Sequence, residues 1–355
     1  MRILAIDLGK NNSVACDYEA PTDEHRFFSI QTTPKDMTKL IRKIAPDRVV
    51  IEISSQAGWV GDMVRSMNID LQVANPNTEG WRWKKVKRKT DRDDALKLAR
   101  LSSMNQLPLV HLPERRVRQW RSLIQYRQSL VSRRTTVKNH IRSILDRQAL
   151  QMPAGKSGWS RARILWLREL AQPLDEASID DLWRGELWEE LEHLESLEAS
   201  IKRIEAKLDE LAASDDRVKT IKTVPGIGNR LSEMVVAVID NPHRFKNSKQ
   251  VGSYVGLTPR QFSSGQFDRQ GGISGRGHNN LRKLLVEVSW LGLRHNPQMR
   301  EIYERVLQGN KTRKKIAIVA VARHLLIWCW AMIRDGTTWD PSRHGTCHTK
   351  RNKAA

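Results

Sequence analysis

Residues 2–12 have the sequence Arg-Ile-Leu-Ala-Ile-Asp-Leu-Gly-Lys-Asn-Asn, in which a short apolar run reaches an acid and then a turn. Two more β-like runs follow at residues 13–16 and 26–30, and turn-forming residues separate them. These three runs predict a strand meander. Pro34 then begins a predicted helix in which apolar residues recur at helical spacing.

A second apolar run that contains one acid lies at residues 48–55, with the sequence Arg-Val-Val-Ile-Glu-Ile-Ser-Ser. A helix at 57–67, a strand at 70–74 and a helix that begins near Thr90 complete the predicted order. This order, with acids on the first strand, the fourth strand and the last helix, resembles the ribonuclease-H-like (RuvC-like) arrangement. The resemblance implies an α/β domain at the N-terminus.

Four carboxylates are the candidate metal ligands and catalytic acids: Asp7, Glu52, Asp91 and Asp94. A charge inside a buried strand is costly unless it is paired or bound to metal, and Asp7 and Glu52 occupy such strands. Asp91 and Asp94 are three residues apart and share a helical face, whereas Asp93 points elsewhere. A ligand set of oxygens alone favours Mg²⁺ or Mn²⁺, and two such ions can clamp both oxygens of a phosphoryl displacement.

The same acids also have a purely structural interpretation. The two strand acids can cap a turn or pair with Arg48 or Lys10, and Thr90 with Asp91 can cap a helix. The combination of four acids in this element order, directly after a basic run, favours the metal site over these separate roles.

The charge of the chain indicates a polyanionic partner. It has 61 Lys and Arg residues against 40 Asp and Glu residues, a net charge of +21. Cations crowd residues 82–147, whereas residues 175–216 are acidic, so we expect one face for nucleic acid and another for protein. The predicted phosphate contacts before the acidic helix are Lys84, Lys85, Lys87, Arg88 and Lys89.

Cysteine usage and hydropathy favour a cytoplasmic protein without a membrane partner. The three cysteines lie far apart, which predicts neither a disulfide framework nor a structural zinc site. The N-terminal apolar run is too short for a signal peptide. The apolar stretch 316–333 is interrupted by Arg323 and His324, so it predicts a buried helix and not a bilayer span.

A long amphipathic helix is predicted at 114–150, and its polar face is almost purely cationic. Alternatively, this helix belongs to a bundle and its cationic face is solvated, in which case its ladder of like charges requires counter-charges. A connector with a short helix follows at 151–174, and from residue 187 a heptad-like series of Leu and Ile predicts a coiled coil with the basic helix or with a second copy. The candidate phosphate contacts of the basic helix are Arg116, Arg121, Arg127, Arg134 and Lys138.

Residues 224–228, Val-Pro-Gly-Ile-Gly, precede a helix and are typical of a helix-hairpin-helix. There Gly226 and Gly228 let backbone N–H groups approach a phosphate, although a plain turn between two helices remains an alternative. Further on, Ser274 lies in a Gly-rich loop near Arg276 and Arg282, where cations could stabilise an alkoxide or hold a phosphate. A simple turn is again the alternative, and the competing serines are Ser263, Ser264 and Ser289.

Taken together, these motifs resemble the DEDD insertion-sequence transposases whose bridge RNA guides recombination of donor and target DNA. The resemblance covers most of the chain. It implies an α/β plus α protein with a RuvC-like catalytic domain at 1–108, a basic and coiled-coil helical domain at 109–215 with a linker near 151–174, a mainly helical transposase domain with a helix-hairpin-helix at 216–340, and a basic tail at 341–355. The motifs that carry it surround the four acids and include Pro225-Gly-Ile-Gly, Gly256-Leu-Thr-Pro-Arg and Ile273-Ser-Gly-Arg-Gly-His.

The resemblance also implies a mechanism, in which Ser274 attacks a DNA phosphate and the acids with Mg²⁺ activate that phosphate. Its implied partners are donor and target DNA, a bridge RNA and further copies of the chain in a homodimer or tetramer, in the nucleoid of a prokaryotic cytoplasm. The family pattern has a lysine straight after the serine where this chain has Gly275, so Arg276 would supply the cation. Two alternatives remain: a metal-dependent RuvC-like junction endonuclease that forms no covalent intermediate, and a non-catalytic nucleic-acid-binding scaffold.

Overall fold

The computed structural model describes residues 1–75, 90–154, 158–264 and 267–344. By its internal contacts the chain divides into two units, Met1–Arg118 and Gln119–Ala355.

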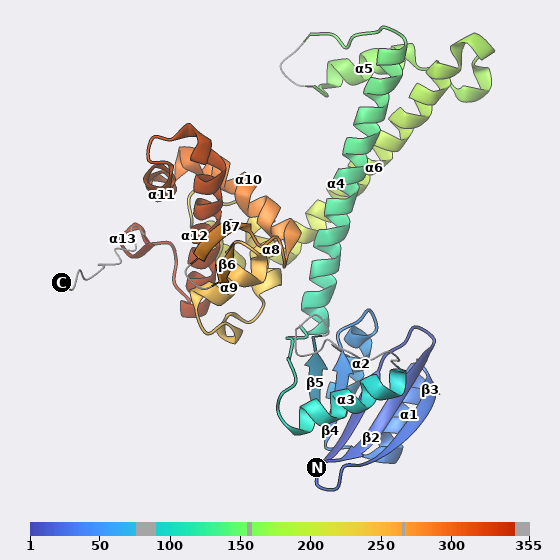
Figure 1. Ribbon diagram of the computed structural model, residues 1–355. Helices are drawn as coiled ribbons and strands as arrows, with labels where there is room; N and C mark the ends of the chain where they lie inside the picture. Colours follow the sequence, from blue (N-terminus) through green and yellow to red (C-terminus); the bar gives the residue numbers. More distant parts are fainter. Residues whose placement is uncertain (76–89, 155–157, 265–266, 345–355) are drawn as a thin grey trace, which may run out of the picture. The chain divides into compact units, whose positions relative to one another are not determined.

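The first unit is built on a mixed five-stranded sheet in the order β3-β2-β1-β4-β5. The strand β1 pairs antiparallel with β2 and parallel with β4, β2 pairs antiparallel with β3, and β4 pairs parallel with β5. This topology confirms the predicted order of elements and fits the expected ribonuclease-H-like domain (Figure 1). The strands are β1 (Arg2–Asp7), β2 (Asn12–Glu19), β3 (Glu24–Gln31), β4 (Arg48–Glu52) and β5 (Asp70–Ala74).

Three helices cover the two faces of this sheet: α1 (Pro34–Ile44), α2 (Ala57–Ser66) and α3 (Asp91–Ser103). Successive side chains of a strand point to opposite faces. On β1, Leu4 and Ile6 pack with the buried residues of α1 and α2, whereas Ile3 and Ala5 pack with those of α3. The sheet therefore has two cores, one on the α1 and α2 face and one on the α3 face.

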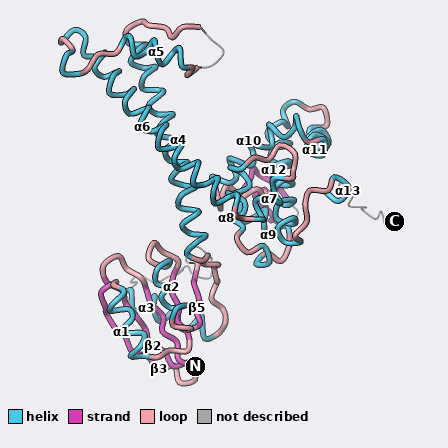
Figure 2. The backbone as a smooth tube through the Cα atoms, turned by 180° about the vertical axis from the view of Figure 1, so that it is seen from behind, coloured by secondary structure: helices cyan, strands magenta, loops and turns pink. Residues whose placement is uncertain are grey.

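The second unit contains a long helical hairpin. The basic helix α4 (Arg115–Arg147) begins in the first unit and runs into the second, where it lies beside α6 (Leu182–Ala213), with α5 (Arg161–Leu170) packed at the far end (Figure 2). Ion pairs join Arg127 to Glu205 and Lys138 to Glu198, so the two helices are antiparallel. The Leu-rich helix thus packs against the basic helix of the same chain, one of the two partners that the sequence left open. Two 3₁₀ turns, η2 (Leu174–Glu176) and η3 (Ile179–Asp181), precede α6.

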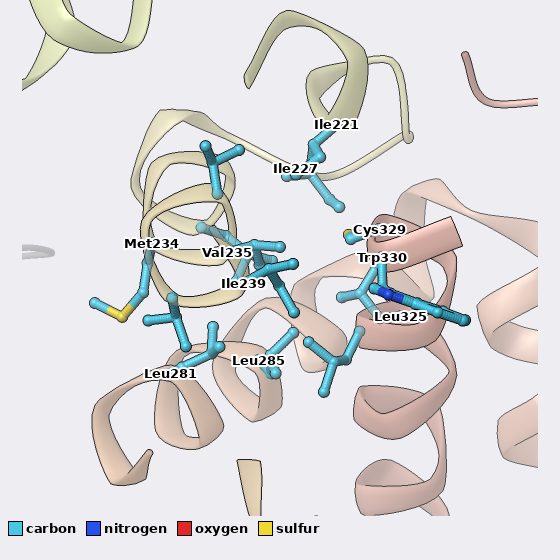
Figure 3. Packing of buried hydrophobic residues seen from close by; sticks show 14 of the residues in the cluster. Ile221, Ile227, Met234, Val235, Ile239, Leu281, Leu285, Leu325, Cys329 and Trp330 are labelled. Carbon is cyan, nitrogen blue, oxygen red and sulfur yellow. The ribbon is translucent and has the colours of Figure 1, made fainter. Parts of the chain in front are cut away.

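The rest of the second unit is a helical domain around one large core. Figure 3 shows Ile221 and Ile227, Val235 and Ile239 of α8, Leu285 of α10, and Leu325, Cys329 and Trp330 of α12 directed into the same space. Its elements are α7 (Asp216–Lys222), α8 (Asn229–Ile239), η4 (Pro242–Arg244), α9 (Ser248–Val255), β6 (Pro259–Ser264), β7 (Phe267–Ile273), α10 (Asn279–His295), α11 (Pro297–Leu307), η5 (Lys311–Arg313), α12 (Lys314–Asp335) and α13 (Pro341–His344).

Two features of this domain bear on the sequence predictions. Ser274 lies in a loop, as predicted, but the sequence did not predict the antiparallel hairpin of β6 and β7 that precedes it. In the described part of the chain, the segment Lys311–Asp335 alone is long and apolar enough to span a membrane, but 56% of its most apolar window is buried inside the fold. The expectation of a buried helix therefore holds for α12, which packs on the core in Figure 3.

Candidate functional site

The two strand acids lie at one edge and on one face of the sheet. Asp7 ends β1 and Glu52 ends β4, directly after the paired residues Ile6 and Ile51 of these parallel strands. Because side chains alternate, Asp7 follows Ala5 onto the α3 face, and Glu52 follows Val50, which packs in the same core. Both carboxylates are therefore expected at the carboxyl edge of the sheet, under α3.

The helix α3 runs antiparallel to β1 and β4, which brings its acidic start to that same edge. Near the end of the helix, Arg100 forms a bidentate ion pair with Asp23, in the turn between β2 and β3 at the opposite edge. Ser102 Oγ donates to Gln72 Oε1 at 2.7 Å, and Arg48 at the start of β4 donates to Ser102 Oγ at 3.4 Å. The eleven residue steps from Asp91 to Ser102 advance about 16 Å along the helix, and β1 is about 16 Å long, so α3 extends over the length of β1.

The three acids of the first turn of α3 have different surroundings. Asp94 is only 6% exposed and lies with Ala95 and Leu98 on the face that covers the sheet, whereas Asp91 is exposed. Asp93 completes a capping box, since its Oδ2 accepts from the Thr90 backbone N at 3.1 Å and from Thr90 Oγ1 at 2.6 Å. Asp93 is thus engaged in the helix cap, which Thr90 forms with Asp93 and not with Asp91.

One structural alternative for the acids is not realised. Arg48 forms its ion pair with Asp70, at 2.6 Å between Nε and Oδ2, and not with Glu52. Asp7, Glu52 and Asp94 share an edge and a face, and their carboxylate oxygens are donors that suit Mg²⁺ or Mn²⁺. Among the described residues, however, no group of three or more His, Cys, Asp or Glu side chains is arranged so that it could hold a metal ion. The fold thus brings the backbone positions of these three acids to one edge of the sheet, and a metal role for them remains a prediction.

Several candidate phosphate contacts on α4 are engaged within the fold. Arg121 donates to the carbonyl oxygens of Ala237, at 2.6 Å, and Val238, at the C-terminal end of α8. Burial lowers the pKa of this guanidinium. The ion pairs of Arg127 and Lys138 with α6 supply the counter-charges of the alternative bundle interpretation. The acidic segment is thus largely a partner of the basic helix and not a separate face for protein.

Other cations of α4 remain open to solvent. Arg116 is exposed and Arg134 is partly exposed, and neither has a hydrogen-bond or ion-pair partner among the residues that the structure describes. These two keep the predicted capacity to contact phosphate. The basic run Lys84, Lys85, Lys87, Arg88 and Lys89 lies outside the described residues.

Ser274 follows the last residue of β7 and is partly buried. Its backbone N donates to Thr258 O at 2.8 Å, and its carbonyl oxygen accepts from Arg260 Nη2 at 3.3 Å. In the described part of the chain, its hydroxyl has no hydrogen-bond partner. Ser289, by contrast, is fully buried, and its Oγ donates to Leu285 O at 2.7 Å, which removes it as a candidate nucleophile. Ser263 and Ser264 lie on β6.

The backbone after Ser274 is fixed by Arg282, which was predicted to contact phosphate. Its guanidinium donates to the carbonyl oxygens of Val255, at 2.8 Å, and Gly275, at 3.2 Å, and to Asn279 Oδ1 at 2.9 Å. Gly275 has φ +66°, a conformation that a lysine would adopt only under strain. The side chain of Arg276 is exposed. Arg282 is therefore a positioning residue for the serine loop. The sequence shows only that Arg282 lies three residues after Asn279, and it does not reveal the contacts with Val255 and Gly275.

His278 is the N-cap of α10, because its Nδ1 accepts from Leu281 N at 3.2 Å. Burial lowers the pKa of His278, and the nearby cations Arg121 and Arg282 lower it further. Both effects favour the neutral ring, and the capping nitrogen, which already accepts from Leu281 N, is not available as a general base for Ser274.

The predicted helix-hairpin-helix glycines differ in their roles. A Cβ on Gly226, which has φ +89°, would lie 3.3 Å from Gly292 Cα, so this glycine allows the turn to pack against α10. A Cβ on Gly228 would meet no atom within 4 Å, so the start of α8 is open on this side. Of the two glycines, Gly228 is the one whose surroundings leave room for a ligand.

Comparison with known proteins gives the family. Residues 4–149 match the DEDD transposases of IS110 elements, and residues 218–304 match the family described as "Transposase IS116/IS110/IS902 family". The "Probable family 20 transposase" of Pseudomonas aeruginosa is 28% identical over 328 residues, which cover 90% of this chain and 93% of that protein. The "Transposase for insertion sequence element IS1328" of Yersinia enterocolitica is 23% identical over 95% of this chain and 98% of its own length.

A "Pilin gene-inverting protein" of Moraxella lacunata is 32% identical over 130 residues, 36% of this chain and 40% of that protein. Among solved structures, "T. thermophilus RuvC in complex with Holliday junction substrate" is 12% identical, with a TM-score of 0.23, and spans 31% of this chain and 99% of that chain. The two family matches and the near full-length relatives lead to one conclusion. The chain belongs to the DEDD transposases of the IS116/IS110/IS902 family.

Proposed function

We propose that this transposase cuts and rejoins DNA strands through a transient ester between Ser274 and a DNA phosphate. The observation that carries the proposal is the setting of Ser274: its hydroxyl has no partner in the described part of the chain, while its backbone is held on both sides. A fixed backbone with an unengaged hydroxyl is what a nucleophile requires.

In the first step, the Ser274 Oγ–P bond forms as the bond from phosphorus to one strand-end oxygen breaks. The serine loses its proton and the departing oxygen gains one. In the second step, the hydroxyl of another strand end attacks the same phosphorus and expels the serine, which takes a proton back. The number of phosphate ester bonds is conserved, so rejoining requires no external energy source.

The acidic edge of the first unit would support this chemistry. Asp7, Glu52 and Asp94 would hold a divalent cation, with Asp91 at the solvent side, because these acids share one edge and one face of the sheet. When bound, Mg²⁺ or Mn²⁺ supplies charge stabilisation at the phosphate oxygens. We further propose that the serine and the acids come together in an assembly of two or four copies and that a bridge RNA selects the DNA.

The proposal is tested by incubating the protein with DNA that carries its element ends, Mg²⁺ and total RNA from its host, followed by denaturing electrophoresis. A protein–DNA adduct should form and should be lost in Ser274→Ala. The double variant Ser263→Ala/Ser264→Ala is the matched control and should retain it. Cleavage without any adduct would favour the endonuclease alternative and contradict the proposal. Treatment with ribonuclease before incubation tests the RNA partner, and it should abolish the adduct.

A further inference from the structure

A large groove lies beside the serine loop in the second unit. It has a volume of about 1450 Å³ and is lined by β7 and by the helices α11 and α12. This volume exceeds the ~300–1,000 Å³ of ordinary small-molecule pockets. The groove is therefore large enough for a short segment of a polymer.

The floor of the groove is apolar because α12 has two apolar stripes. Leu325 and Cys329 point into the core, as Figure 3 shows. Ile316, Val319 and Ile327 recur at helical spacing on another side of the same helix and line the groove. Ile316 is 60% exposed. Val319 and Ile327 are partly buried and also pack against the core, so Ile316 supplies most of the exposed apolar surface on this side of α12.

The walls of the groove carry an excess of positive charge. Its cationic lining residues are Arg269, Arg305, Arg313, Lys315 and Arg323, and its acidic lining residue is Asp335. Asp335 pairs with Arg334 at 2.7 Å. In the described part of the chain, none of the five cations pairs with a carboxylate. Their charges are thus left for an anionic ligand.

The groove also adjoins Ser274 along the chain. Gly271, Gly272 and Ile273 of β7 line it, and Ser274 is the next residue. A Cβ on Gly272 would meet no atom within 4 Å, so the backbone there is open to a ligand. A polymer that lies along β7 therefore passes the serine within one residue of the end of the strand.

We propose that this groove binds single-stranded DNA, with bases on the apolar floor and phosphates at the cations. A duplex presents sugars and phosphates to its surroundings, whereas a single strand exposes the apolar faces of its bases. The choice of DNA rests on the proposed function, because the serine beside the groove attacks a DNA phosphate. The groove would hold the strand whose phosphate Ser274 receives.

The test measures binding of fluorescein-labelled oligonucleotides by the full-length protein in the Ser274→Ala background, so that no adduct forms. Arg305→Ala/Lys315→Ala removes two phosphate contacts. The log–log salt slope for single-stranded DNA should fall by about 1.4, and the affinity at 0.1 M salt should fall about 25-fold. The matched control is Lys202→Ala/Arg203→Ala, which removes the same charge from exposed positions on α6 and should retain the wild-type slope. Ile316→Ala should weaken binding about fivefold with an unchanged slope.

Equal losses in the groove and control variants would overturn the proposal. So would a larger effect on duplex DNA or on RNA of the same sequence, or a change in self-association instead of in DNA binding. The two proposals fail separately. If the groove variants lose binding but the wild-type protein forms no adduct, the serine mechanism fails alone. If adducts form and groove variants bind single strands normally, the groove proposal fails alone.

Discussion

The buried acid Glu233 allows a quantitative prediction about stability. It lies in α8 with 1% of its surface exposed, and it accepts from Arg230 Nη1 at 2.9 Å through Oε1. Its Oε2 has no partner among the described atoms. Burial raises the pKa of Glu233 to about 7 from 4.5, although Arg230 opposes this shift. Burial dominates because the ion pair satisfies only one carboxylate oxygen.

The sign of the pH effect follows from the raised pKa. Below pH 4.5 the carboxyl is neutral in both the folded and the unfolded state, so Glu233 has no electrostatic cost. Between pH 4.5 and about 7 the unfolded chain ionises while the folded protein stays protonated, which lowers the free energy of unfolding. The difference between a pKa of 4.5 in the unfolded chain and about 7 in the folded protein corresponds to roughly 3 kcal/mol at pH 8. Above pH 7 the penalty is constant.

Glu233→Gln should remove this penalty while it keeps the shape of the side chain. The melting transition of the second unit should rise by about 6–12 °C at pH 8 and little at pH 4.5, as followed by calorimetry or circular dichroism. The matched control is Glu210→Gln, an exposed acid paired with Lys207 on α6, where the expected effect is under about 1 kcal/mol at either pH. An equal effect of Glu233→Gln at both pH values, or a destabilisation at pH 8, would refute the argument.

Three further predictions concern the proposed site. Asp94→Asn should reduce adduct formation by about 100-fold or more without lowering the melting temperature, because metal charge stabilisation is worth several kcal/mol. A gel time course in Mg²⁺ measures this rate. An unchanged rate would count against a metal role for Asp94. Arg282→Ala should slow adduct formation while DNA affinity stays constant, because the serine loop loses the hydrogen bonds that Arg282 donates to its backbone. A rate of adduct formation equal to that of the wild type would exclude a positioning role. Thr90→Ala should destabilise the first unit by about 1 kcal/mol through the lost capping box, measured by urea unfolding, and Ser103→Ala at the other end of α3 is the control.

The fold of the first unit was readable from the sequence because local signals and tertiary packing agree there. Apolar runs marked β1 and β4, Pro34 and Thr90 marked helix starts, and each buried face had its expected period. The hairpin of β6 and β7 was missed because its residues are polar and Gly-rich, so no alternation of apolar residues marks it.

The candidate site was only partly readable for a different reason. The sequence predicted Asp7 and Glu52 in two buried strands and Asp91 with Asp94 on one face of a helix, since strand and helix periods determine faces. It could not show that Arg121 caps α8 or that α6 neutralises Arg127, because those contacts join residues far apart in the chain. Glu233 was also missed, and its signal was a lone acid within the apolar run Leu231–Ile239.

The most direct test of the central claim is mass spectrometry of the trapped adduct after nuclease and trypsin digestion. Trypsin cleaves after Arg269 and Arg276 and releases residues 270–276, in which Ser274 is the sole serine, whereas Ser263 and Ser264 lie in the peptide 261–269. If Ser274 is the nucleophile, the peptide 270–276 should carry a nucleotide remnant. A remnant on the peptide 261–269, or on neither peptide while DNA is still cut, would contradict it.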